Sequence, residues 1–136
     1  MMQLILGLQE INRSNRPIAG GKGFVLSQLA RKEIRVPEAL CITTHAYDAY
    51  LDETGLRERI MLEFFRKELD DMRWEEIWDA STRIRNLFIS TPIPESLQTE
   101  LAQPIEAYFK DRPVAVRSSA IDEDSARASF AGLHES

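Results

Sequence analysis

Two short segments of the sequence carry the residues best suited to bind an anion. The first, Gly20-Gly21-Lys22-Gly23, places three glycines and a lysine where a helical pattern begins. The N–H groups at a helix start and the positive end of the helix dipole favour phosphate, and the Lys22 ammonium adds a point charge. A plain glycine turn explains the same residues. Their spacing fits neither a P-loop nor a dinucleotide-binding fingerprint.

The second segment lies near the end of the sequence, where the apolar run 114–116 leads into Arg117-Ser118-Ser119. A guanidinium that follows a buried strand can hold phosphate oxygens in a two-point contact. An ion pair between Arg117 and one of the acids in residues 122–124 explains the arginine equally well. Neither serine is marked as a nucleophile, because no Gly-x-Ser-x-Gly turn surrounds it.

The other polar residues that could do chemistry predict no metal site in this sequence. The acidic run 122–124 lacks the continuation of a calcium-binding loop and is typical of solvated surface. His45 and His134 have no Cys or His partner at metal-ligand spacing. Cys41 is the single cysteine and lies in an apolar run, which favours a buried structural thiol over a nucleophile.

The composition limits the class of protein. Hydrophobic residues make up 43% and charged residues 29%, which is typical of a globular chain. The formal net charge is −5, and no apolar run reaches the ~20 residues of a membrane span. A single cysteine agrees with a reducing compartment, so we expect a cytoplasmic protein without a membrane partner.

Charge is unevenly distributed along this acidic chain. Residues 1–36 contain more basic than acidic residues: Arg13, Arg16, Lys22, Arg31, Lys32 and Arg35 against Glu10 and Glu33. A local basic excess favours an anion site over a nucleic-acid surface. No zinc-finger spacing or interleaving of aromatic and basic residues supports nucleic-acid binding either.

The elements that must position the two segments predict a mixed α/β (α+β) fold. Short strands are expected at residues 4–8 and 39–42, and residues 114–116 predict a last strand buried on both faces. Helices are expected over residues 22–34, 43–51, 56–69 and 74–89. The aromatic residues of the last two helices, which include Trp74, Trp78, Phe64 and Phe65, are predicted to face a core.

Three prolines predict boundaries. Val36-Pro37 should end the first helix, because the residue before proline avoids the α region. Pro94 suits the first turn of a further helix, which Pro104 should kink or split. Residues 120–136 have little periodicity and predict a loop that is mobile without ligand.

The order and content of these segments resemble the nucleotide-binding domain of the phosphoenolpyruvate synthase and pyruvate phosphate dikinase family, which includes rifampicin phosphotransferase. In that family a Gly-Gly-Lys-[Gly/Asn] segment opens the domain, as at residues 20–23. A Val-Pro segment with [IV]-[ST]-x-x-Ala-[FY] follows, as at residues 36–47. A long Val-Arg-Ser-Ser-Ala motif then ends in [AP]-Gly-x-x-[DE]-[ST], as at residues 116–136.

The resemblance implies an ATP-grasp-like domain, of which residues 1–136 are the first, incomplete N-terminal subdomain, with the remainder expected after residue 136. By the resemblance, Lys22 and Arg117 would bind ATP phosphates, Gly132 would bring backbone close to the nucleotide, and Ser136 would contact phosphate. Leu133 stands where many members carry Gln, and Ser136 replaces the usual Thr. The ligands of Mg²⁺ and the catalytic residues would lie outside this chain.

The function implied is the ATP-binding part of a phosphotransferase. The parent enzyme would pass phosphate from ATP through a phosphohistidine domain to an acceptor such as pyruvate, or to a rifamycin-type antibiotic. The alternative is a free-standing nucleotide-binding or regulatory module without catalysis. Residues 1–136 alone are expected to be inactive and prone to self-association through an uncovered edge or apolar face.

Overall fold

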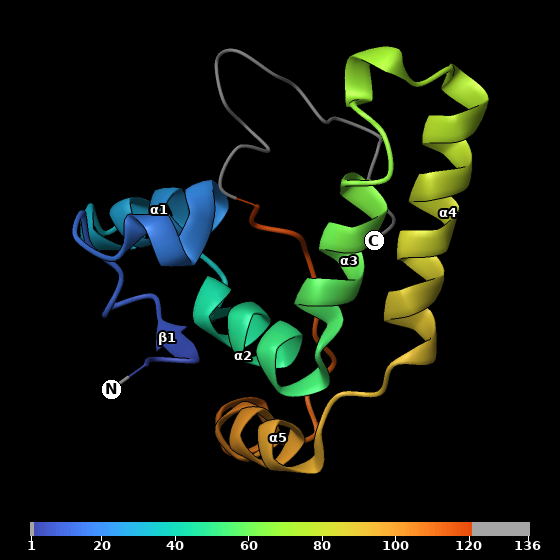
Figure 1. Ribbon diagram of the computed structural model, residues 1–136. Coiled ribbons are helices and arrows are strands. Elements are labelled where there is room, and N and C mark those ends of the chain that lie inside the picture. The colour runs from blue at the N-terminus through green and yellow to red at the C-terminus, as the bar shows by residue number, and fades with distance from the viewer. Residues whose placement is uncertain (1, 121–136) are drawn as a thin grey trace. The chain divides into compact units, whose positions relative to one another are not determined.

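The computed structural model describes residues 2–120, and these divide into two compact units (Figure 1). The first unit is discontinuous and combines Met1–Ala46 with Thr99–Ser136, and the second is Tyr47–Gln98. Two helices cross the boundary between the units: α2 (Thr44–Thr54) and α5 (Glu95–Phe109).

The first unit contains a small antiparallel sheet made of β1 (Ile5–Gly7) and β2 (Leu40–Ile42). Leu6 lies opposite Cys41 in the register, and both side chains are buried. The backbone N–H of Thr43 donates to the carbonyl of Leu4 at 2.9 Å, which continues the pairing beyond β2. The strands expected at residues 4–8 and 39–42 are therefore confirmed.

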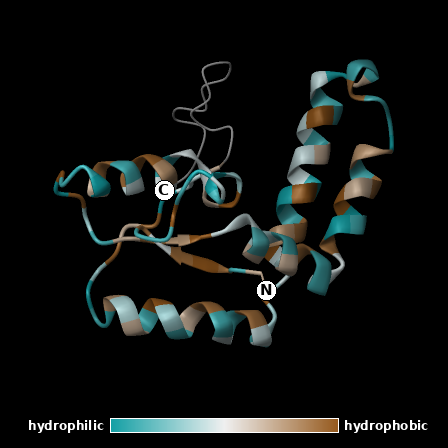
Figure 2. Ribbon diagram, turned by 90° about the vertical axis from the view of Figure 1, so that its left-hand side faces the viewer, coloured by the Kyte–Doolittle hydropathy of each residue, from teal (hydrophilic) through white to brown (hydrophobic). Residues whose placement is uncertain are grey.

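The core of the first unit forms where α1 (Arg16–Arg31) packs on the sheet. Its buried members are small or branched and come from both layers: Leu6, Ile11, Ala19 and Cys41, with Leu8, Ile18 and Phe24 packed against them. In Figure 2 the brown, apolar strands lie between α1 and the part of α5 that belongs to this unit. The predicted mixed α/β class is confirmed, with mostly helical content.

Helix α1 begins earlier and ends earlier than the pattern 22–34 predicts. Pro17 lies in its first turn, where a missing N–H costs nothing. At the other end Glu33 adopts a left-handed conformation (φ 58°), its N–H donates to the Ala30 carbonyl, and the N–H of Ile34 donates to the carbonyl of Leu29 at 3.1 Å. This is a Schellman ending. The helix therefore stops before Val36-Pro37, and that proline is not what ends it.

The second unit is a set of short helices in which α3 (Leu56–Phe64) and α4 (Trp74–Ser90) pack against each other. A 3₁₀ turn at Leu69–Asp71 lies between them. The ring of Phe88 on α4 stacks between Tyr47 and Tyr50 of α2, with centroids 6.2 Å from each. Helix α3 ends five residues before the predicted boundary at residue 69.

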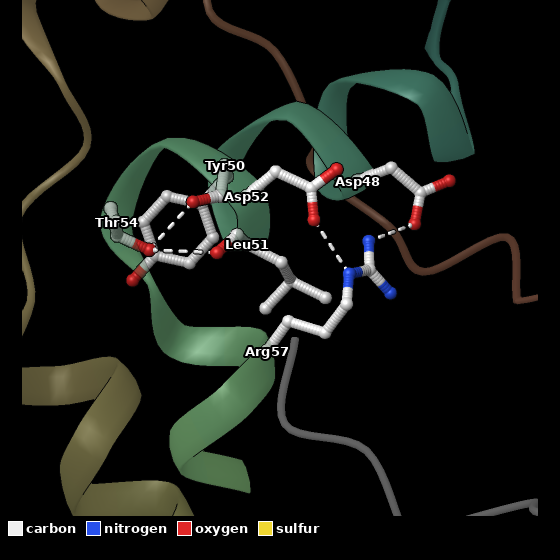
Figure 3. A network of polar contacts seen from close by, with 6 residues as sticks. All are labelled: Asp48, Tyr50, Leu51, Asp52, Thr54 and Arg57. Carbon is white, nitrogen blue, oxygen red and sulfur yellow. Dashed lines mark hydrogen bonds and ion pairs between the residues drawn. The ribbon is translucent and has the colours of Figure 1, made fainter. Parts of the chain in front are cut away.

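A polar network fixes the bend between α2 and α3 (Figure 3). Gly55 makes this bend with a left-handed backbone (φ 67°). Arg57 then reaches back to α2, where Nη2 lies 2.8 Å from Asp48 Oδ1 and Nε lies 2.6 Å from Asp52 Oδ1. The hydrogen bonds to Asp52 and Asp48 raise the pKa of the Arg57 guanidinium further above its usual range.

The predicted burial of the aromatic residues in α3 and α4 is wrong for most of them. Trp74 and Trp78 are 71% and 68% exposed, and Phe64 and Phe65 are also exposed. Phe88 is half-buried. The periodicity correctly predicts two amphipathic helices. A two-helix hairpin buries only the stripe between its helices, however, so the remaining apolar positions face outward.

The C-terminal part of the described chain corrects two further predictions. Helix α5 runs through Pro104 without splitting. Pro104 has no N–H for the carbonyl of Glu100, but that residue is exposed and water can satisfy the oxygen. Residues 114–116 form no strand, and Val116 is 80% exposed. An apolar run becomes a buried strand only where a partner strand pairs with it, and residues 2–120 supply none.

Among residues 2–120, no helix combines the length and the apolar character that crossing a membrane requires. The predicted loop 120–136 lies almost entirely outside the described residues.

Candidate functional site

The glycine segment interrupts α1 and divides the helix into a first turn and a longer second part. Gly20 has φ 78° and ψ 173°, far from helical values, while the residues on either side of it belong to the helix. This backbone region is accessible almost only to glycine. The second part of α1 therefore begins afresh at Gly21, and its first turn carries Lys22 and Gly23. The pattern that starts at residue 22 predicts this second part of α1 but not the turn at residues 16–19 that precedes it.

The hydroxyl of Ser119 lies inside this interruption. The N–H of Gly23 donates to Ser119 Oγ at 3.1 Å, and Oγ donates to the carbonyl of Ala19 at 3.0 Å. Ala19 and Gly23 are four residues apart, so an unbroken α-helix would join them directly. Here one hydroxyl bridges the two groups instead, which is a recognised cause of a sharp helix kink.

The carbonyl of Ala19 also accepts a hydrogen bond from the sheet. The thiol of Cys41 on β2 lies 3.2 Å from it and can donate its S–H. Cys41 is 8% exposed, and burial raises the pKa of its thiol above the usual range. A raised pKa keeps the sulfur protonated and a poor nucleophile, which agrees with the structural role predicted for it.

Gly20 is also required by the close approach of Ser119. A Cβ atom placed on Gly20 would lie 1.7 Å from the carbonyl oxygen of Ser119 and 2.7 Å from its Oγ. No side chain fits in that space. The glycine segment and the serine segment are therefore packed backbone to backbone, as the orange chain reaching α1 in Figure 1 shows.

This contact brings the two predicted cations to the same region of the first unit. Lys22 directly precedes Gly23 and is half-buried, and Arg117 lies two residues before Ser119 and is exposed. Two residues of chain span at most about 7 Å, so the Arg117 backbone starts close to the interruption in α1. Gly132 and Ser136, the other two predicted site residues, lie outside the described residues.

The chemistry available here is anion binding. Two cations and a helix start favour phosphate oxygens. No group of three or more His, Cys, Asp or Glu residues in the described part of the chain is arranged to hold a metal ion. The acidic run 122–124 lies outside that part. His45 is placed on α2 with its Nδ1 buried and without a hydrogen-bond partner in the described residues.

Ser119 is the site residue that sequence reasoning missed. The sequence presents its hydroxyl only as one of two beside Arg117 and indicates no role for it. Its partners lie about a hundred positions away, and no local pattern links a serine to a glycine at that separation. The only signal in the sequence is indirect: the chain contains one glycine-rich segment, residues 20–23, and one pair of serines, residues 118–119.

A kinked helix start with a lysine, tied to a segment with an exposed arginine, has the charges and N–H groups that favour an anion. The chain belongs to the family of the pyruvate phosphate dikinase AMP/ATP-binding domain, which matches residues 16–136. The resemblance predicted from the motifs is thereby confirmed.

Curated relatives from bacteria and archaea agree with this family. The chain is 32% identical to the rifampicin phosphotransferase of Bacillus subtilis over 136 residues, which are 99% of this chain and 16% of that protein. It is 37% identical to the phosphoenolpyruvate synthase of Aeropyrum pernix over 141 residues, covering 98% of this chain and 17% of that protein. The chain spans between 12% and 20% of the length of the relatives it matches.

Proposed function

We propose that this chain is the N-terminal subdomain of an ATP-grasp-like domain and that it binds the phosphates of ATP through Lys22 and Arg117. The observation that supports the proposal is the Ser119 bridge, because it ties the Arg117 segment to the helix turn that carries Lys22. Two cations from distant parts of the chain suit a polyphosphate better than a single anion. By family resemblance, Gly132 and Ser136 complete the phosphate side of the site.

The proposal extends to the protein that contains this domain. Relatives named phosphoenolpyruvate synthase and rifampicin phosphotransferase are phosphotransferases several times longer than this chain. We infer a parent enzyme, in the cytoplasm, that passes phosphate from ATP through a phosphohistidine domain to an acceptor. Pyruvate and a rifamycin-type drug are the two acceptors that the relatives' names suggest.

The metal and the reacting groups belong to other parts of that protein. Mg²⁺ would neutralise charge on the ATP phosphates during transfer, and its acidic ligands are proposed to follow residue 136. Lys22 and Arg117 would bind and orient the phosphates from this side. Residues 1–136 alone are then expected to bind nucleotide weakly and to transfer no phosphate. Phosphate transfer by residues 1–136 at the rate of the complete gene product would refute this division.

The binding proposal is tested with Lys22→Ala and Arg117→Ala in the complete gene product, titrated with ATP and with adenosine in a calorimeter. Each variant should lose about 1.5–3 kcal/mol of binding free energy for ATP, the value of a charged hydrogen bond. Adenosine binding should be unchanged. Equal losses for ATP and adenosine would remove the phosphate role from these residues.

The matched controls are Lys32→Ala and Arg35→Ala. Lys32 is the C-cap of α1 and is exposed, and Arg35 is exposed just beyond it. Ten helical residues separate Lys32 from Lys22, which is about 15 Å along the axis. Both controls remove the same charge without touching the proposed site, so ATP affinity should stay at the wild-type value.

A further inference from the structure

We propose that Ser119 is a positioning residue for the triphosphate: its hydroxyl holds α1 open at Gly20 and so fixes Lys22 relative to Arg117. This inference rests on the proposed ATP-binding function. It concerns a residue whose hydroxyl contacts the backbone of the glycine segment and would act through that backbone.

The hydrogen-bond inventory of the serine supports a positioning role. A hydroxyl has one proton to donate and accepts through its oxygen. Ser119 uses that proton on the Ala19 carbonyl and accepts the N–H of Gly23. Its proton is therefore engaged with protein backbone and is not available to a phosphate oxygen. The neighbouring Ser118 is exposed and makes no such bridge within residues 2–120.

The bridge also decides between two backbone states of α1. The N–H of Gly23 and the carbonyl of Ala19 are the two groups that a continuous helix would pair directly. Both residues are buried, so without the hydroxyl the Gly23 N–H must pair with the Ala19 carbonyl or remain unsatisfied, while that carbonyl keeps its contact with the Cys41 thiol. Direct pairing requires Gly20 to leave its left-handed backbone. Removing the hydroxyl therefore favours closure of the helix and turns Lys22 away from its present place.

The same bridge holds the Arg117 segment. The carbonyl of Ser119 lies against Gly20, at 1.7 Å from the place of a Cβ atom. Closure of the helix would displace that segment, because a regular backbone at Gly20 cannot keep the present approach. One hydroxyl thus sets the positions of both cations, and its loss should affect the triphosphate and not the adenosine end of the ligand.

The test compares Ser119→Ala, Ser119→Thr and the control Ser118→Ala in the complete gene product. Hydrogen–deuterium exchange of a peptide that covers residues 19–25 reports on the Gly23 amide. Calorimetric titrations with ATP and with adenosine report on binding. Ser119→Ala should slow exchange in that peptide, because the Gly23 N–H then pairs directly with the Ala19 carbonyl, and should weaken ATP binding about fivefold, the value of one neutral hydrogen bond. Adenosine affinity should not change, and Ser119→Thr should restore both measurements toward wild type.

Each other outcome overturns the inference. Unchanged or faster exchange in Ser119→Ala would show that the helix does not close when the hydroxyl is lost. Slower exchange with wild-type ATP affinity would show a bridge without a positioning role. Equal losses of ATP and adenosine would show a general structural role. If the wild-type protein does not distinguish ATP from adenosine, the proposed function fails, whereas the exchange comparison still tests the bridge itself.

Discussion

Gly20 and Ser119 are in direct contact although they lie at opposite ends of the described chain. A Cβ atom on Gly20 would meet the Ser119 carbonyl oxygen at 1.7 Å, and Gly20 has a backbone conformation (φ 78°) that other residues rarely adopt. The missing Cβ of Gly20 thus serves the interruption of α1 twice, because it permits the positive φ and leaves room for the Ser119 carbonyl.

The first prediction follows from this contact. Gly20→Ala should lower the free energy of unfolding by about 2 kcal/mol or more, because it adds backbone strain and a steric overlap. Gly21→Ala is the matched control, since nothing lies within 4 Å of a Cβ atom there. It should leave stability unchanged or raise it by up to about 1 kcal/mol, as alanine favours a helix over glycine. Urea unfolding of both variants measures the difference.

The second prediction concerns the end of α1. Glu33 is a non-glycine residue in the left-handed region (φ 58°), at the position of a Schellman ending where glycine is preferred. Glu33→Gly should raise the free energy of unfolding by about 0.5–1 kcal/mol, because it removes that strain. Glu33→Ala removes the same charge but keeps the strain. Equal stabilities of the two variants would show that the left-handed backbone costs nothing here.

The third prediction concerns acid pH and the start of α4. The Glu76 carboxylate accepts the N–H of Arg73 at 2.8 Å and lies 3.1 Å from Lys67 Nζ. The backbone hydrogen bond from Arg73, followed by the bond from Lys67, lowers the pKa of Glu76 below its usual range. Because the pKa of Glu76 is lower in the folded state, its carboxylate stabilises the fold at pH values above the ordinary pKa of glutamate. This contribution is lost as the pH falls through the lowered value.

Glu76→Gln should therefore be less stable than wild type at neutral pH, and the difference should vanish in acid. Unfolding curves measured at several pH values give the comparison. Glu75→Gln is the control, because it removes a charge from the same turn without affecting these two contacts. A difference between wild type and Glu76→Gln that stays constant down to strongly acid pH would contradict the assignment.

The fourth prediction uses the two tryptophans of the chain. Trp74 and Trp78 are 71% and 68% exposed. Residues 1–136 should therefore emit fluorescence close to that of tryptophan in water, and acrylamide should quench it nearly as well as in the unfolded chain. Trp78→Phe assigns the contribution of each ring. A blue-shifted, protected emission would place the rings in a core, as their helical spacing alone suggests.

The tryptophans illustrate how far the sequence predicts this fold. Period 3.6 correctly places α4 at Trp74–Ser90, against an expected 74–89. The same period says which residues share a face but not what covers that face. The apolar run at residues 114–116 has the same limit, because burial of a strand depends on a partner that the run itself does not specify.

The sequence indicates the charged residues of the candidate site, but it does not indicate the contact that brings their segments together. Local chemistry makes Lys22 and Arg117 candidates for phosphate but leaves a plain turn and an ion pair open, and the family resemblance selects the phosphate role for both. The bridge by Ser119 is a tertiary contact across about a hundred residues, and no local rule encodes it. The start of α1 at Arg16 was missed because two adjacent glycines predict a turn, whereas one of them tolerates a kink within a helix.

The division of the chain has a consequence for folding order. The first unit is made of two stretches of chain, which end at Ala46 and begin again at Thr99. The stretch Tyr47–Gln98 therefore lies within the loop that the contact between Gly20 and Ser119 closes. That contact cannot form until the loop closes, and the glycine kink should be acquired late. Closure entropy grows only with the logarithm of loop length, about 0.6 kcal/mol for each doubling. Extra helices inserted between Ala46 and Thr99 would therefore alter the folding rate more than the stability of the kink.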